Sequence, residues 1–240
     1  MRKLIAVCCL VLAVMPLRAQ YSASESFSWE KLIVPGILIG AGTIASFSPW
    51  YQDNVDTPIQ QWALDVSGGK QFPLDNYLQF APWLGYAAAI PLVPSEHTWQ
   101  EKTLVLGTSF TLMMALVYST KYLTGVGRPN SHNHMSFPSG HTAMAFVGAE
   151  IVRQEYGPWW GLAAYSAAAA TGFLRVYNNW HWSSDVIAGA GVGILSGMAA
   201  YWLLPWEREV FKLDSSRTNV SASYLPAPYN AHVVSVSVKF

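Results

Sequence analysis

The stretch NHMSFPSGHTAM, residues 133–144, joins a polar, turn-prone run to the apolar segment 141–152. Ser139 is a residue type favoured at helix N-caps, so the run predicts a helix that starts at Gly140 or His141. Backbone amides at such a start lack helical partners and, with the positive end of the helix dipole, attract oxyanions. Gly140 has no side chain to block an approaching group, so we expect the amides of Ser139 and Gly140 to form a phosphate-binding turn.

Apolar residues gather in blocks on both sides of this stretch. Only 12% of all residues are charged, against about 25% in a soluble domain. Several blocks approach the roughly 20 residues that a helix needs to cross a bilayer. The pattern predicts an all-α, membrane-embedded bundle of about six helices, although the shorter blocks also fit buried helices of a soluble all-α enzyme. The blocks are residues 32–48, 78–94, 103–120, 141–152, 158–174 and 185–204.

Small residues recur at helical spacing within two of these blocks. Gly189, Gly193 and Gly197 lie four apart on one face of the last block, and Gly36 and Gly40 repeat the pattern in the first. Small residues let helix backbones approach closely in lipid. We therefore expect both sets of glycines to lie at close helix–helix contacts.

Charged and ionisable side chains of the bundle concentrate at the ends of the apolar blocks. If consecutive helices run antiparallel, these ends meet on one side of the bundle. Permanent cations would not gather there without compensation, so the simplest occupant of that side is an anion. The residues concerned are Lys121, Arg128, His141, Arg175, His181 and Asp185.

The spacing of these residues suits phosphate chemistry. Arg128 and Arg175 can each form bidentate hydrogen bonds to phosphate oxygens, and Lys121 supplies a further positive charge. His181 and Asp185 are four apart on a helical period, so the carboxylate can hold one imidazole nitrogen and orient the other as a nucleophile. His141 would then be placed to act as the general acid for the leaving oxygen.

Three stretches together resemble the signature motifs of the type-2 phosphatidic acid phosphatase superfamily. Lys121, six intervening residues and Arg128-Pro129 match the first motif, and residues 138–141, Pro-Ser-Gly-His, match the second. Arg175, His181 and Asp185 match the third, in which Leu174 replaces a serine that precedes the arginine. The resemblance covers roughly residues 30–205.

This resemblance implies an all-α phosphatase that needs neither a metal nor another cofactor. It assigns His181 as the nucleophile that forms a phosphohistidine, Asp185 as the residue that holds it, and His141 as the general acid. The phosphoryl oxygens would be bound by Lys121, Arg128, Ser139, Gly140 and Arg175. The implied substrate is a phosphate monoester or pyrophosphate of a membrane lipid. Candidates are lipid A, undecaprenyl pyrophosphate, phosphatidylglycerol phosphate and phosphatidic acid.

Other functions compete with this interpretation. A periplasmic acid phosphatase acting on soluble phosphomonoesters and a vanadium-dependent haloperoxidase share the motifs, whereas a membrane scaffold would not need the two histidines and the aspartate together. A zinc site built from His132, His134, His141 and His181 is disfavoured, because three neighbouring cations repel a divalent metal. A nucleic-acid partner is not expected, since the net charge is zero.

The two ends of the chain differ from this core. Residues 1–19 read as a signal peptide or an uncleaved signal anchor, and both cysteines, Cys8 and Cys9, lie there. We assign residues 20–205 to the helical phosphatase domain and residues 206–240 to a tail, where alternating polar and apolar residues predict a β-hairpin. Residues 55–66 form an amphipathic pattern, either a helix on the membrane surface or one that covers the core.

The distribution of basic residues bears on orientation. Outside the motifs, Lys70 is the only basic residue on the side of the site, so the positive-inside rule places that side in the periplasm of a bacterial inner membrane. A cleaved signal peptide followed by six spanning helices would place it in the cytoplasm. Either the N-terminal segment is processed differently or block 32–48 does not span. The opposite side carries Lys31, Lys102, Arg153, Arg208, Lys212 and Arg217.

Overall fold

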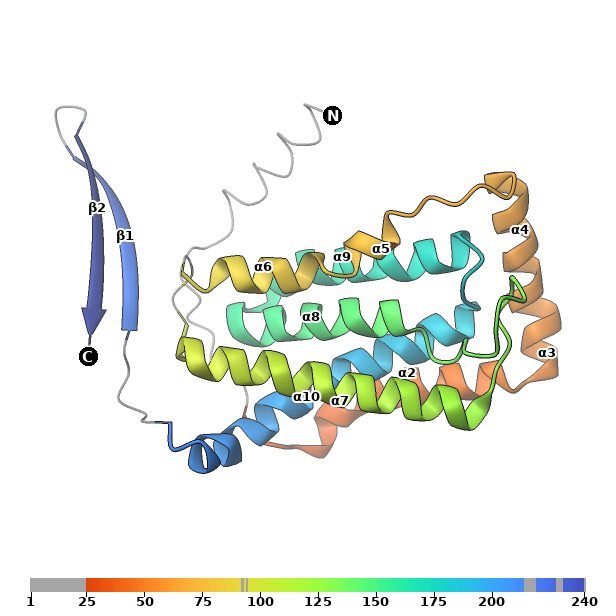
Figure 1. Cartoon of the computed structure of the whole chain (residues 1–240), viewed down its shortest axis with the longest axis horizontal. Coiled ribbons are helices and arrows are strands. Elements are labelled where there is room, and N and C mark those ends of the chain that lie inside the picture. Colours follow the sequence, from red (N-terminus) through yellow and green to blue (C-terminus); the bar gives the residue numbers. More distant parts are fainter. Residues whose placement is uncertain (1–24, 92, 94, 214–218, 228–230, 240) are drawn as a thin grey trace.

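A computed structural model describes residues 25–91, 93, 95–213, 219–227 and 231–239, so the predicted signal segment 1–19 lies outside the described residues. Each of the six apolar blocks forms helix, which confirms the predicted all-α bundle (Figure 1). The elements are η1 (Trp29–Leu32), α2 (Ile33–Ser46), α3 (Pro49–Tyr51), η2 (Gln52–Asp56), α4 (Thr57–Ser67), α5 (Asp75–Leu78), α6 (Ala81–Ala89), α7 (Trp99–Thr124), α8 (Gly140–Tyr156), α9 (Pro158–Tyr177), α10 (Ser183–Val210), β1 (Asn219–Ala227) and β2 (Ala231–Lys239).

Local sequence signals set the ends of the long helices. Thr98 and Glu101 form a reciprocal capping box at the start of α7, and Gly125, in the left-handed conformation with φ 57°, ends it. The side chain of Ser139 accepts the amide of Thr142 and so caps α8, as predicted. Pro158 occupies the first turn of α9, where its missing N–H costs nothing.

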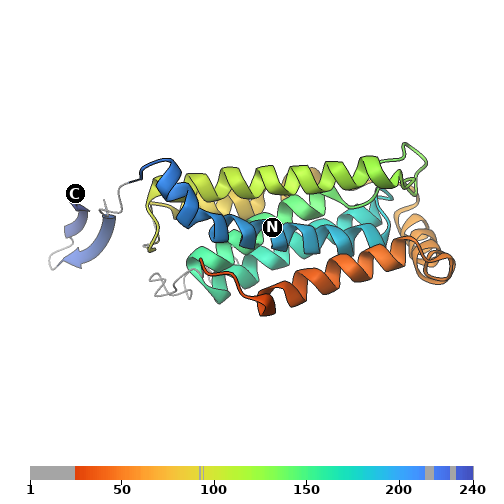
Figure 2. The ribbon, with the colours of Figure 1, turned by 90° about the horizontal axis from the view of Figure 1, so that it is seen from below.

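Helix α10 lies at the centre of the packing. It contacts α2, α7 and α8, while α8 also packs against α9 and α6 (Figure 2). The predicted glycine stripe forms the α8–α10 contact, because a Cβ on Gly189 would stand 2.6 Å from the Ser139 carbonyl oxygen and one on Gly193 2.5 Å from that of Ala143. Backbones therefore touch directly along this seam.

The expected contact through Gly36 and Gly40 is wrong. A Cβ on either residue would meet nothing within 4 Å. Helix α2 instead approaches α10 through Gly42, where a Cβ would stand 2.5 Å from the Ala188 amide nitrogen, and through Gly191 on α10. The face that α2 buries is set by α10, and the spacing of glycines within α2 does not reveal it.

Among the described residues, α7 and α10 are long and apolar enough to cross a membrane, and the segments 29–46 and 49–67, bent by 83°, qualify together as a third candidate. The amphipathic residues 55–66 lie within the second of these segments, and most of them belong to α4. Helix α10 continues past Pro205 to Val210. Beyond it, β1 and β2 pair antiparallel from Asn219↔Lys239 to Ala227↔Ala231, which confirms the predicted hairpin.

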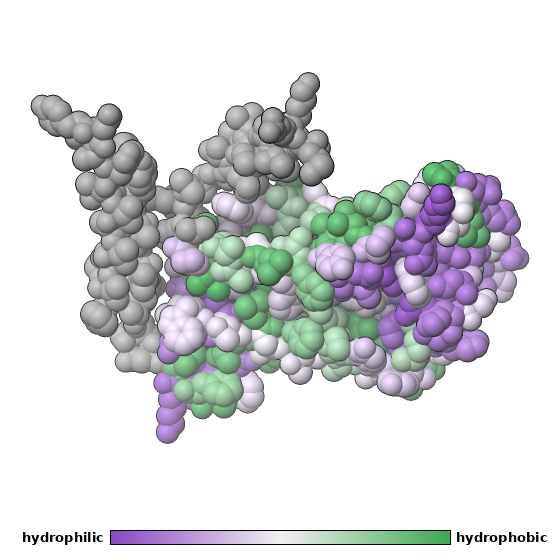
Figure 3. Space-filling model, turned by 45° about the horizontal axis from the view of Figure 1, so that its top comes forward, coloured by the Kyte–Doolittle hydropathy of each residue, from purple (hydrophilic) through white to green (hydrophobic). Residues whose placement is uncertain are grey.

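The chain reversals bring the functional ends of the helices together. Helix α7 ends, α8 begins, α9 ends and α10 begins at the end of the bundle that also carries α3 and α4 (Figure 1). Hydrophilic residues cover this end in the space-filling view, and apolar residues dominate the middle of the bundle (Figure 3). The predicted site residues thus meet at one polar end, which we call the site end.

Candidate active site

His181 and Asp185 form the centre of the site. His181 precedes α10, Asp185 lies in its first turn, and the His181 Nδ1 is 3.2 Å from the Asp185 Oδ2. Ser136 contributes a third group: its hydroxyl donates to the same oxygen over 2.5 Å and lies 3.3 Å from the His181 Nδ1. All three side chains are at most 2% exposed. A carboxylate acceptor at Nδ1 favours the tautomer in which Nε2 carries the free lone pair.

Asp185 also joins the Pro-Ser-Gly-His turn to α10. Its Oδ2 accepts the Trp182 amide over 3.0 Å, and its backbone carbonyl accepts the amide of Ser139 over 3.0 Å. The expectation that the Ser139 amide faces a phosphate is therefore wrong, because α10 already uses that donor. Ser139 caps α8, and Gly140 and His141 are the residues of the turn that line the cavity.

A cavity of about 280 Å³ opens against these residues. Five of the predicted site residues line it, together with apolar side chains of α7 and α8. The cavity therefore offers both charged and apolar contacts to a bound molecule. The predicted residues are Lys121, Arg128, Gly140, His141 and His181, and the apolar wall contains Met113, Met114, Val117 and Met144.

Two cations of the cavity are held by neutral acceptors of the loop between α7 and α8. The Lys121 ammonium donates to the carbonyls of Met135 at 2.6 Å and Ser136 at 2.9 Å. Arg128 donates from Nε to the Asn133 side chain at 3.0 Å. Neutral acceptors position these cations without cancelling their charge, so the charge remains available to an anion.

Arg175 is held differently. Its NH1 donates to the Asp75 carboxylate over 2.6 Å, and its guanidinium lies 5.4 Å from the centre of the Trp180 ring. Arg175 is only 3% exposed and is not among the residues that line the cavity. The sequence reasoning missed Asp75, whose carboxylate precedes the second apolar block and belongs to no motif.

The surroundings of both histidines favour their neutral forms. Burial, reinforced by the charges of Lys121 and Arg175, holds the pKa of His181 well below its usual 6.5. Burial and the charge of Arg175 lower the pKa of His141, in the first turn of α8, from 6.5 to about 3. A neutral His181 is a competent nucleophile, whereas His141 needs a bound anion to raise its pKa before it can donate a proton.

The four histidines of the disfavoured zinc site do not converge. The His132 ring packs on Trp180 at a centroid distance of 5.9 Å, and His134 lies against Gly127. Within the described part of the chain, no three His, Cys, Asp or Glu side chains are grouped so that they could hold a metal ion.

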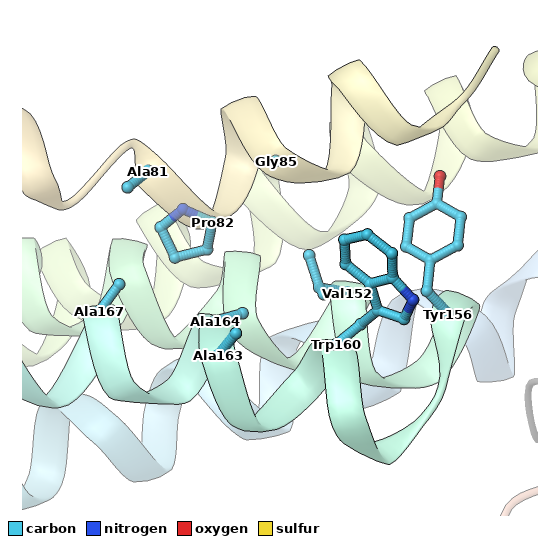
Figure 4. A pocket seen from close by; sticks show the side chains of 9 residues that line it. All are labelled: Ala81, Pro82, Gly85, Val152, Tyr156, Trp160, Ala163, Ala164 and Ala167. Carbon is cyan, nitrogen blue, oxygen red and sulfur yellow. The ribbon is translucent and has the colours of Figure 1, made fainter. Parts of the chain in front are cut away.

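A second cavity, of about 200 Å³, lies between α6, α8 and α9. Pro82 and Gly85 of α6 face Ala164 of α9, with Tyr156 and Trp160 at one end (Figure 4). The side chains that line it are uncharged, so it lacks the groups that phosphate chemistry requires.

Comparisons with known proteins point to one family. Residues 93–209 match the family model of the PAP2 superfamily. The chain is 36% identical over 155 residues to the lipid A 1-phosphatase of Porphyromonas gingivalis, an alignment that covers 62% of this chain and 35% of that protein. It is 26% identical over 158 residues to the undecaprenyl-diphosphatase of Sulfolobus acidocaldarius, which covers 52% of this chain and 77% of the relative.

The chain thus spans about a third of the length of the Porphyromonas protein. A crystal structure of Aquifex aeolicus LpxE superimposes with a TM-score of 0.40 and 23% identity, covering 74% of this chain and 98% of that one.

Proposed function

Since this chain belongs to the PAP2 superfamily through residues 93–209, we propose that it is a metal-independent phosphatase acting on a membrane lipid. The observation that carries the proposal is the cavity in which His181, held by Asp185 at 3.2 Å, meets Lys121, Arg128 and His141. A buried, neutral imidazole oriented by a carboxylate and surrounded by cations is suited to attack a phosphoryl group.

The residues support a reaction in two steps. In the first, the Nε2 of His181 attacks phosphorus, the bond between phosphorus and the lipid oxygen breaks, and His141 donates a proton to that oxygen. In the second, His141 takes a proton from water, the water oxygen attacks phosphorus, and the phosphorus–nitrogen bond breaks to release orthophosphate. Lys121, Arg128 and the turn at Gly140 would stabilise the charge on the phosphoryl oxygens throughout.

The apolar wall of the cavity supports a lipid as the substrate. Met113 and Val117 are four apart on α7, as are Val117 and Lys121, so one helix face leads from apolar side chains to the ammonium. Met144 of α8 faces the same space. A substrate that carries its phosphate at the end of a hydrocarbon region matches this order of side chains. The relatives named for lipid A and undecaprenyl diphosphate make these two lipids the first candidates.

We place the protein in a bacterial inner membrane with the site end facing the periplasm. The basic residues outside the motifs support this orientation, because the sequence pattern assigns Lys70 to the side of the site and six others to segments expected on the opposite side. Glu25 contacts His97 and Arg208 at the end of the bundle opposite the site. Asp56 lies at the site end, where its carboxylate accepts the amide of Ser183 at the start of α10. Block 32–48 therefore runs along the bundle, which favours an N-terminal segment that is not processed as a conventional signal peptide.

Phosphate release from purified protein in detergent micelles tests the activity. The panel contains lipid A, undecaprenyl pyrophosphate, phosphatidylglycerol phosphate, phosphatidic acid and a soluble phosphomonoester, each in the presence of EDTA. We expect release from at least one lipid, complete loss in H181A, and retention in H97Q, which removes a buried histidine at the other end of the bundle. Release that requires a divalent metal, or that survives in H181A, would refute the proposal.

Reporter insertions test the orientation. A β-lactamase domain inserted after residue 130 should confer ampicillin resistance, and one inserted after residue 155 should not. The opposite pattern would place the site in the cytoplasm.

A further inference from the structure

We propose that Asp75 is a positioning residue that holds Arg175 in the orientation needed to bind the phosphoryl group. The inference rests on the proposed function for the identity of the ligand. Asp75 lies in α5, outside residues 93–209 that match the family and outside the three motifs. It enters the site only through the tertiary structure, since 100 residues separate it from Arg175.

The two oxygens of the Asp75 carboxylate have different partners. Oδ2 accepts from the Arg175 NH1 over 2.6 Å, and Oδ1 accepts from the Asn178 Nδ2 over 2.9 Å. The exposed fractions are 0% for Asp75, 3% for Arg175 and 2% for Asn178. A charge pair this deeply buried is costly unless its remaining hydrogen bonds are satisfied, and Asn178 satisfies the second oxygen.

Asn178 also fixes the backbone that carries Asp75. Its side-chain oxygen accepts the Phe72 amide over 2.7 Å, and its side-chain nitrogen donates to the Phe72 carbonyl over 2.9 Å. The segment from Phe72 to Asp75 is thus clamped to the C-terminal end of α9, next to Arg175. The same short helix leads to Gln79, which lines the catalytic cavity.

This arrangement leaves a specific donor of Arg175 uncommitted. NH1 is bound to Asp75, and the centre of the Trp180 ring lies 5.4 Å from the guanidinium carbon. The Nε is buried and has no hydrogen-bond partner among the described residues. A guanidinium held on two sides cannot rotate freely, so its Nε–H keeps one direction. The charge of Arg175 acts on both His141 and His181, which places it within electrostatic reach of the reacting group.

A purely electrostatic role for Asp75 predicts the opposite effect of its removal. Without the carboxylate, the site gains one positive charge, and Coulomb attraction alone would tighten the binding of an anion. If Asp75 acts by positioning, its loss frees the guanidinium and weakens binding. The sign of the change in phosphate affinity therefore separates the two roles.

The test measures orthophosphate binding to the purified full chain by titration calorimetry, which does not depend on turnover. We expect D75A to weaken binding by about 10-fold or more, the size of a lost hydrogen bond to a charged group. D75N should weaken it less, because the amide oxygen still accepts from NH1. The double variant D75A/R175A should bind no more weakly than R175A, since Asp75 acts only through Arg175. Unchanged or tighter binding in D75A, or additive losses in the double variant, would overturn the proposal.

E155Q is the matched control. Glu155 is also buried and paired, but with His97 and Lys102 at the end opposite the site. We expect E155Q to lower the melting temperature without changing phosphate affinity. An equal loss of affinity in E155Q would show that D75A acts through general destabilisation. If wild-type protein binds orthophosphate in a manner that depends on Asp75 but hydrolyses no substrate of the panel, the proposed function fails and this inference stands.

Discussion

The hydroxyl of Ser136 lies 2.5 Å from Oδ2 of Asp185, the same oxygen that accepts from His181. Asp185 Oδ1 has no partner among the described residues, so Oδ2 carries the hydrogen bonds that hold the carboxylate. Ser136 donates from the loop that also supplies the backbone carbonyls around Lys121. The orientation of His181, the proposed nucleophile, therefore depends on a residue that belongs to none of the three motifs.

From this contact we predict that S136A lowers kcat by about 10- to 100-fold with little change in KM. A hydrogen bond to a charged group contributes about 1.5–3 kcal/mol, and this one acts on the orientation of His181 rather than on substrate binding. Steady-state phosphate release checks it. S109A is the matched control, because Ser109 is equally buried and, within the described part of the chain, its hydroxyl donates to the carbonyl of Leu106 on its own helix and to no other residue. A wild-type kcat in S136A would contradict the prediction.

We predict that activity does not decline as the pH falls from 7.5 through 6.5. His181 must be neutral to attack, and its pKa is held well below 6.5, so protonation removes the nucleophile only under more acidic conditions. The measurement is the pH profile of kcat/KM for the best lipid of the panel. A decline centred on pH 6.5, the ordinary pKa of histidine, would show that His181 is not shifted.

The seam between α8 and α10 should not tolerate a methyl group. We predict that G193A destabilises the protein by about 1–3 kcal/mol, the usual cost of overpacking, because the added Cβ would lie 2.5 Å from the Ala143 carbonyl oxygen. G36A is the matched control, since a Cβ there meets nothing within 4 Å. Thermal unfolding in detergent compares the two. Equal melting temperatures in both variants would argue against the packing described for this seam.

A buried network at the end opposite the site should make stability depend on pH. Despite burial, which opposes the shift, hydrogen bonds to Glu155 and Glu25 raise the pKa of His97 from 6.5 to about 9. A raised pKa in the folded state means that the protonated form contributes its full stability below pH 6.5 and loses it as the pH rises through 9.

We therefore predict that the melting temperature falls between pH 6.5 and 9, and that H97Q is less stable at pH 6.5 and largely lacks this dependence. Differential scanning fluorimetry of the two proteins over that range checks it. The same slope in H97Q would assign the effect to another group.

Local sequence patterns were sufficient for part of this structure. The apolar blocks predicted every long helix, because a helix requires only a contiguous run of suitable residues and an end signal such as Ser139 or Gly125. The same blocks placed Lys121, Arg128, His141 and His181 at helix ends, and antiparallel packing of consecutive helices brought them to one cavity. The close contact through the glycines of α10 was also predicted, since residues spaced four apart lie on one face of a helix.

Other features could not be read from local patterns. The pattern of Gly36 and Gly40 resembles that of α10, yet α2 packs through Gly42, because the partner helix selects the face. The sequence around Ser139 predicts a backbone amide that binds phosphate. In the structure this amide instead donates to the carbonyl of Asp185. Each of these outcomes depends on a residue in a distant helix, and single-helix periodicity carries no information about it.

By itself, the sequence determined the helical bundle, the order of the motifs and the chemical types of the proposed site residues, because these depend on residue identity and on spacing within a few turns. Only the tertiary structure decided which residues hydrogen-bond to the side chains of the site and so position them. Asp75 reaches Arg175 across 100 residues and Ser136 reaches Asp185 across 49. Such pairs form where packed helices exclude water and leave buried charges that need partners, and that requirement exists only in the folded bundle.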